Sequence, residues 1–162
     1  MLADWADAPG TEVRTEVEVE EWAEKVKGRD GVDRVEKAFL DVRLEILNAP
    51  GPNVHYFDPT VYNPFADTRP SAAGAELRKR TRYPVRWPDG SVRVNGELHP
   101  LAISSLGGLS ATGALSLRRV GKLIRRPAAG LIQSLGFWAV LASARALLTA
   151  HGMSSATKAH LL

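Results

Sequence analysis

The chain contains no cysteine among its 162 residues. A protein without thiols has no disulfides, no thiolate zinc site and no cysteine nucleophile, so three kinds of site are excluded. Carboxylates are also missing from a long stretch, because the last acidic residue is Glu97 and residues 98–162 are basic or uncharged. We therefore expect two regions, an acidic one over 1–97 and an acid-free one over 98–162, that meet different surroundings.

Catalytic motifs are equally sparse. Gly121 and Lys122 are followed by Leu123, where a phosphate-binding loop requires serine or threonine. Residues 108–112 lack the closing glycine of a nucleophile elbow. No histidine lies four residues from another, so neither a metal site nor a cofactor is predicted. The sequence favours a protein that is not an enzyme and has no small-molecule substrate.

One group of acid–base side chains occurs close together in sequence. It consists of His55, Tyr56 and Asp58, a base, a phenol and a carboxylate. These residues lie in a proline-rich segment, and loops of this composition more often have a structural role. We therefore assign them no catalytic function.

A helix is predicted in the acidic region after Asp33, which fits as its N-cap. Proline cannot continue a helix, so Pro50 would end it. Four apolar side chains recur at helical spacing and form one stripe: Val35, Phe39, Val42 and Ile46.

The segment from Pro50 to Pro70 combines five prolines with four aromatic residues. It is too rich in proline for a helix and too aromatic for a disordered linker, so we expect an ordered, irregular strap. The strap either packs its rings on its own domain or docks a partner. The candidate docking residues are Tyr56, Phe57, Tyr62 and Phe65.

A basic run and a turn signal follow the strap. Residues 76–82 include four basic side chains, which indicate a solvated helix end or, as the alternative, a contact with phosphate. Residues 83–87 and 91–94 flank Pro88-Asp89-Gly90, a pattern that predicts a β-hairpin or a three-stranded meander.

The acid-free region contains two long uncharged runs, Leu98–Leu117 and Pro127–Ala144, joined by a basic connector. Each run approaches the length that crosses a hydrocarbon core, and a basic loop between two spans fits the positive-inside tendency. The alternatives are a basic amphipathic helix lying in a lipid interface and an ordinary pair of core helices. The side chains expected to contact lipid phosphates or an acidic partner are Arg118, Arg119, Lys122, Arg125 and Arg126. The expected apolar anchor comprises Leu131, Leu135, Phe137, Trp138 and Leu141.

The same region supports a nucleic-acid alternative. A short helix over Ser104 to Ala111, a turn and a basic helix over Leu115 to Arg126 would make a helix-turn-helix. The preceding hairpin would then serve as the wing of a winged-helix-like module.

Part of the acidic region resembles a known group of proteins. The residues 44–48, followed by Phe57-Asp58-Pro59-Thr60 and Tyr62-Asn63-Pro64, resemble a pattern near the start of some tailed-phage tail proteins. The resemblance implies a soluble structural component of a virus or phage particle as a further alternative.

These observations predict a mainly α fold with a small β-hairpin or meander and a C-terminal pair of apolar helices. The favoured function is a non-catalytic accessory or structural subunit of a larger, membrane-bound assembly. Its expected partners are other protein subunits and membrane lipids, with nucleic acid as the alternative. The N-terminus carries no secretory signal, and membrane association is the favoured localisation.

Overall fold

The computed structural model describes residues 1–29, 31–47, 53–66 and 71–150, and these form an α+β fold. The strands are β1 (Thr11–Glu18), β2 (Glu24–Lys27), β3 (Asp33–Glu36), β4 (Phe39–Ile46), β5 (Val54–Tyr62) and β6 (Glu97–Ser104). The helices are α1 (Leu2–Ala6), α2 (Ala72–Arg82), α3 (Ala111–Leu123) and α4 (Ala129–Ala150), with a short 3-10 helix at Glu20–Trp22.

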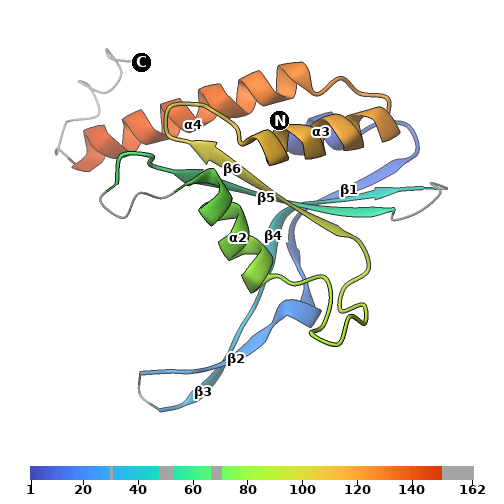
Figure 1. Ribbon diagram of the computed structural model, residues 1–162, viewed down its shortest axis with the longest axis vertical. Helices are drawn as coiled ribbons and strands as arrows, with labels where there is room; N and C mark the ends of the chain where they lie inside the picture. Colours follow the sequence, from blue (N-terminus) through green and yellow to red (C-terminus); the bar gives the residue numbers. More distant parts are fainter. Residues whose placement is uncertain (30, 48–52, 67–70, 151–162) are drawn as a thin grey trace.

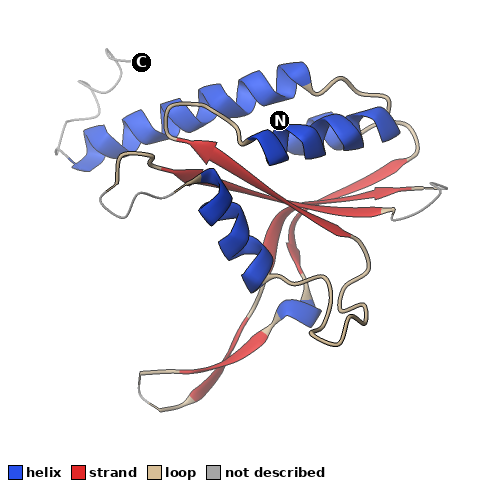
Figure 2. Ribbon diagram, in the orientation of Figure 1, coloured by secondary structure: helices blue, strands red, loops and turns tan. Residues whose placement is uncertain are grey.

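Four of the strands form one mixed sheet in the order β1-β4-β5-β6. The β1–β4 and β4–β5 pairs are antiparallel, whereas β5 and β6 run parallel and are connected through α2. Helices α1, α3 and α4 cover one face of this sheet, and α2 lies across the other (Figure 1). Strands β2 and β3 form a separate two-stranded ribbon that extends away from the sheet (Figure 2).

The core is divided into two clusters. The larger one lies between the sheet and helices α1, α3 and α4, and its fully buried members include Phe57, Leu101 and Leu117. The smaller one surrounds Trp22, which is 2% exposed and donates its indole N–H to the carbonyl oxygen of Pro84. Helices therefore cover one face of the main sheet, whereas on the other face α2 covers mainly β5 and β6.

The prediction of a mainly α protein is wrong, because β-strands make up much of the chain between Thr11 and Ser104. The helix predicted after Asp33 is instead strands β3 and β4. Every second side chain of β4 is buried, from Leu40 to Ile46, which is the period of a strand. The helical stripe was misleading because Val42 and Ile46 satisfy both spacings. Its predicted end at 48–51 lies outside the described residues.

The predicted strap is also corrected in part. Residues 54–62 form β5, an interior strand of the main sheet, instead of an irregular segment. Pro59 is tolerated there because the ladder between β4 and β5 ends at Phe57, so at Pro59 the strand is paired only with β6, where Leu101 is its partner. The predicted hairpin is reduced to one isolated bridge between Arg86 and Val92, and Trp87 is 47% exposed.

The acid-free region contains one long apolar helix and not a pair. The first uncharged run forms β6 and the start of α3, while the second forms α4. Residues 105–110 make a turn before the N-cap of α3, Ser110, so the helix predicted over Ser104 to Ala111 is wrong. Helix α4 lies against this turn through glycine, because a Cβ on Gly136 would stand 2.3 Å from the carbonyl oxygen of Gly107.

Candidate functional site

Two aspartates face each other at the centre of the main sheet. The antiparallel register pairs Val42 of β4 with Phe57 of β5, so the next residues along it, Asp41 and Asp58, stand opposite one another. Their carboxyl groups are close enough to share a hydrogen bond. Asp58 is only 3% exposed, whereas Asp41 opens to solvent. The pair therefore has one deeply held member and one accessible member.

A third carboxylate lies on the other side of Asp41. The β1–β4 ladder is regular on both sides of Glu16 but omits the pair that Glu16 would make with Asp41. Glu16 has φ 51°, a left-handed backbone conformation that costs a glutamate on the order of 1–2 kcal/mol. Such strain in the middle of a strand persists only where neighbouring structure imposes it, and it is frequent at functional sites.

Lys79 of α2 extends to Asp58 from the covering helix. Its Nζ donates a hydrogen bond of 2.9 Å to Oδ1 and lies 2.8 Å from Oδ2. The contact to Oδ2 is an ion pair without hydrogen-bond geometry, so this buried oxygen has no hydrogen-bond partner. A buried carboxylate oxygen in that state is costly unless another cation or donor satisfies it.

The charges of this site do not balance. Two carboxylates, those of Asp41 and Asp58, lie near a single ammonium group, that of Lys79, and the exposed Glu16 adds its charge from the edge of the site. The pKa of Asp41 is raised from its ordinary value of 3.8, first because burial disfavours the charged form and then because of the negative charge of Asp58. Lys79 opposes this rise. The site is therefore left with net negative charge, which favours binding of a cation.

A divalent cation fits the residues present. Mg²⁺ prefers oxygen ligands and is commonly held by one or two carboxylates, with water and substrate phosphate completing its shell. Asp41 and Asp58 supply two carboxylates from neighbouring strands, and Oδ2 of Asp58, which is ion-paired with Lys79 but accepts no hydrogen bond, is the atom that such an ion would contact. We call Glu16, Asp41, Asp58 and Lys79 the acidic site.

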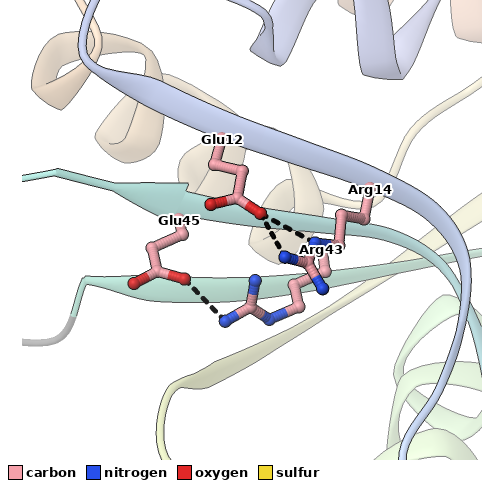
Figure 3. A network of polar contacts seen from close by, with 4 residues as sticks. All are labelled: Glu12, Arg14, Arg43 and Glu45. Carbon is pink, nitrogen blue, oxygen red and sulfur yellow. Dashed lines mark hydrogen bonds and ion pairs between the residues drawn. The ribbon is translucent and has the colours of Figure 1, made fainter.

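A polar network borders the acidic site on the same face of the sheet. On β1, Arg14 donates from Nε to Glu12 at 2.7 Å, and on β4, Arg43 donates to Glu45 at 2.7 Å (Figure 3). The two arginines are partners in the cross-strand register, as are the two glutamates. Each arginine is thus held by a carboxylate two residues away on its own strand. Glu16 lies two residues beyond Arg14 on β1, and Asp41 lies two residues from Arg43 on β4.

Basic residues surround the acidic site on α2. Its last turn carries Lys79, Arg80 and Arg82, and Arg78 is exposed beside them. Ser71 caps the start of the helix by accepting a hydrogen bond from the amide of Gly74 at 3.0 Å. If this basic run contacts phosphate, which the sequence offered as an alternative, the contacting cations lie next to the carboxylates of the acidic site.

The five cations predicted to contact lipid or an acidic partner lie together, around the turn between α3 and α4. They line one shallow depression of about 640 Å³, whose floor includes Gly121 and Ala128. These are Arg118, Arg119, Lys122, Arg125 and Arg126, all of them exposed. Arg119 is also engaged with Glu97 at 3.3 Å, and Arg126 donates to the carbonyl oxygen of Asp7 at 3.1 Å.

The predicted apolar anchor is divided between the core and the surface. Leu131 and Leu135 are buried in the larger cluster, and Leu141 is half-buried. Phe137 and Trp138 are 64% and 50% exposed. Helix α4 contains one segment, Ala129–Thr149, that is long and apolar enough to cross a membrane, and only 22% of its most apolar stretch is buried.

The predicted docking residues are similarly divided. Tyr56 and Phe57 are buried in β5, Tyr62 is half-buried and Phe65 is 75% exposed. The acid–base group that sequence alone suggested is also separated, because His55 and Asp58 point to opposite faces of β5. Only Asp58 joins the acidic site.

Sequence reasoning missed Glu16, Asp41 and Lys79. The available signal was the alternation of Asp41, Arg43 and Glu45 with apolar residues, which is the pattern of a strand with one polar face. That signal was hidden by the interpretation of residues 33–46 as a helix. Comparison with known proteins adds no name, because no family model, curated protein or solved structure matches this chain.

Proposed function

We propose that the acidic site binds a divalent metal ion and hydrolyses phosphodiester bonds, which makes the chain a metal-dependent nuclease. The single observation that carries the proposal is the buried Asp58, paired with Asp41, whose Oδ2 has no hydrogen-bond partner. Carboxylates alone would repel a phosphate. With a divalent cation bound between them, the carboxylates can bind a phosphate through that cation.

Each residue of the acidic site has a role in this chemistry. Asp41 and Asp58 would hold the ion, which would polarise a phosphoryl oxygen and lower the pKa of a bound water. Lys79 lies against Asp58, where its ammonium can stabilise the negative charge that develops on the phosphoryl group. Asp41 is the accessible member of the pair, so substrate approaches from its side.

The substrate class follows from the charges around the site. Arg78 and Arg80 are exposed next to Lys79 in the sequence of α2 and form a basic border, whereas Arg82 is paired with Glu36. A polyanion that spans several phosphates would contact this border while one phosphate reaches the acidic site. DNA or RNA fits better than a single small phosphate ester, because the site lies on an open sheet face and not in a deep pocket.

The test is cleavage of labelled duplex DNA, single-stranded DNA and RNA by the full chain in Mg²⁺, Mn²⁺ or EDTA. Glu12→Gln is the matched control, since Glu12 lies in the adjoining network but outside the acidic site. The proposal expects activity with metal in wild type and Glu12→Gln, and its loss in Asp41→Asn and Asp58→Asn. Equal activity in all four proteins would identify a contaminant and refute the proposal. The sequence-based expectation of a non-catalytic protein is decided by the same assay.

A second candidate function is docking to an anionic membrane within a larger assembly. The observation that favours it is the combination of the basic depression with the exposed apolar side chains of α4, Phe137 and Trp138. Cations would contact lipid headgroups while these rings insert below them. Co-sedimentation with vesicles containing phosphatidylserine tests this function, and binding that is no stronger than to neutral vesicles would contradict it.

A further inference from the structure

A second cluster of possible ligands lies on the opposite side of the sheet from the acidic site. It consists of His55 on β5 and of Glu97 and His99 on β6. Parallel pairing places Glu97 beside His55, and His99 follows Glu97 by two residues on the same face. The fold thus brings together two histidines that are far apart in sequence.

The distances between the three side chains match a metal site. Nδ1 of His55 lies 3.0 Å from Nε2 of His99. Oε2 of Glu97 lies 3.9 Å from the first nitrogen and 3.7 Å from the second. Tetrahedral Zn²⁺ with bonds of about 2.0–2.1 Å has ligand atoms about 3.4 Å apart. The observed triangle differs from that geometry by about half an ångström or less on each side.

Surrounding groups hold two of the three ligands, His99 and Glu97, in place, whereas the buried Nε2 of His55 has no hydrogen-bond partner. His99 stacks on the buried ring of Phe57 at 5.1 Å between centroids, so its orientation is fixed. Arg119 donates to Oε1 of Glu97 at 3.3 Å, which leaves Oε2 directed at the histidines. In metal sites, contacts of this kind from neighbouring residues orient the side chains that bind the ion.

The two rings are prepared as neutral ligands. Burial lowers the pKa of His99 to about 3, and burial also lowers the pKa of His55. Neutral imidazole is the form that binds metal. At present one ring donates a hydrogen bond to the other, and both are almost fully buried, at 1% and 5% exposure.

We infer that His55, Glu97 and His99 form a transition-metal site of the Zn²⁺ class, separate from the acidic site. Two imidazoles and one carboxylate suit Zn²⁺ and Co²⁺ better than Mg²⁺, which prefers oxygen. Glu97 is the ligand through which the ion enters, because its side chain is 27% exposed. The bound ion cross-links β5 to β6 and takes water as its fourth ligand.

The experiment is titration of the metal-free full chain with Co²⁺, followed by visible absorption, with Zn²⁺ competition to measure affinity. We expect the strong absorption of a tetrahedral or five-coordinate site, which saturates at one equivalent and which Zn²⁺ removes, whereas Co²⁺ held by the oxygen ligands of the acidic site absorbs only weakly. Glu97→Gln and His99→Gln are expected to weaken binding by at least about tenfold. Glu97→Gln keeps the side-chain size at a partly exposed position, and circular dichroism confirms that each variant is folded.

Two controls separate this site from the other candidates. Asp58→Asn disrupts the acidic site and is expected to leave the absorption of Co²⁺ at the second site unchanged. A chain with His151→Gln and His160→Gln, which lie outside the described residues, is also expected to bind normally. The inference is overturned if wild type takes up no Co²⁺, if folded Glu97→Gln and His99→Gln bind as wild type does, or if either control loses binding. None of these results depends on nuclease activity.

Discussion

Asp41 and Asp58 lie close together on the neighbouring strands β4 and β5, and the negative charge of Asp58 helps to raise the pKa of Asp41, although both carboxyl groups would be ionised in water at neutral pH. The fold brings together like charges at a place where Lys79 compensates for only one of them. An arrangement of this kind is unfavourable for stability and favourable for binding a divalent cation. The proposed function depends on this relationship.

Asp41→Asn is expected to stabilise the metal-free protein, because it removes repulsion with Asp58. Asp41 is solvent-accessible, so screening limits the gain to no more than about 1 kcal/mol. The folded state raises the pKa of Asp41. Wild type therefore loses stability as the pH rises through that pKa, and the advantage of the variant shrinks as the pH falls towards 3.8. Urea unfolding in EDTA at pH 7 and pH 5 measures both effects, and a variant less stable than wild type at pH 7 would contradict the repulsion argument.

Lys79→Met is expected to lower the cleavage rate by about 100-fold, because loss of one preorganised charge at the reacting group typically has that effect. The matched control is Arg78→Met, which removes an exposed cation from the same helix. The control is expected to change the apparent affinity for substrate more than the maximal rate. The cleavage rate at saturating substrate distinguishes the two variants. An equal loss of rate in both would show that Lys79 acts only through general electrostatic attraction of the substrate.

Gly136→Ala is expected to destabilise the protein by about 1–3 kcal/mol, because its Cβ would stand 2.3 Å from the carbonyl oxygen of Gly107. Both sides of this contact are backbone, so neither can move aside easily. Gly130→Ala on the same helix is the control, since a Cβ there meets nothing within 4 Å. That control is expected to be neutral or stabilising by up to about 1 kcal/mol. Thermal unfolding of the two variants checks the packing of α4 on the turn before α3.

A chain carrying both Phe137→Ser and Trp138→Ser is expected to lose at least about tenfold in affinity for anionic vesicles, as two exposed rings no longer insert. Leu77→Ser is the control, because Leu77 is 63% exposed on α2, on the other face of the sheet. Vesicle co-sedimentation compares the three proteins. Binding that survives in the double variant would show that α4 does not contact lipid.

The sequence predicted the C-terminal half of the fold better than the first half. The apolar run that forms α4 and the basic segment within α3 are both evident in the sequence, and the apolar side chains Leu117, Val120 and Ile124 beside that basic segment are buried. Strand β4 was mistaken for a helix because Val42 and Ile46 are four residues apart, which fits both periods. Strand β5 was hidden by Pro59, which normally argues against an interior strand.

The candidate site was not predictable from local patterns. Glu16, Asp41 and Lys79 come from three separate elements, and only strand register and the crossover through α2 bring them together. The same holds for His55 and His99, which meet because β5 and β6 pair in parallel. The spacing of possible ligands along the sequence can reveal a metal site on one helix. It cannot reveal a site whose ligands come from different strands of a sheet.

The most direct test of the central claim is the cleavage rate of one end-labelled duplex DNA over a Mg²⁺ titration, measured for wild type and Asp58→Asn in parallel. We predict saturable Mg²⁺-dependent cleavage by wild type and a rate at least about 100-fold lower for the variant at every Mg²⁺ concentration. A folded Asp58→Asn protein that cleaves as fast as wild type would contradict the account.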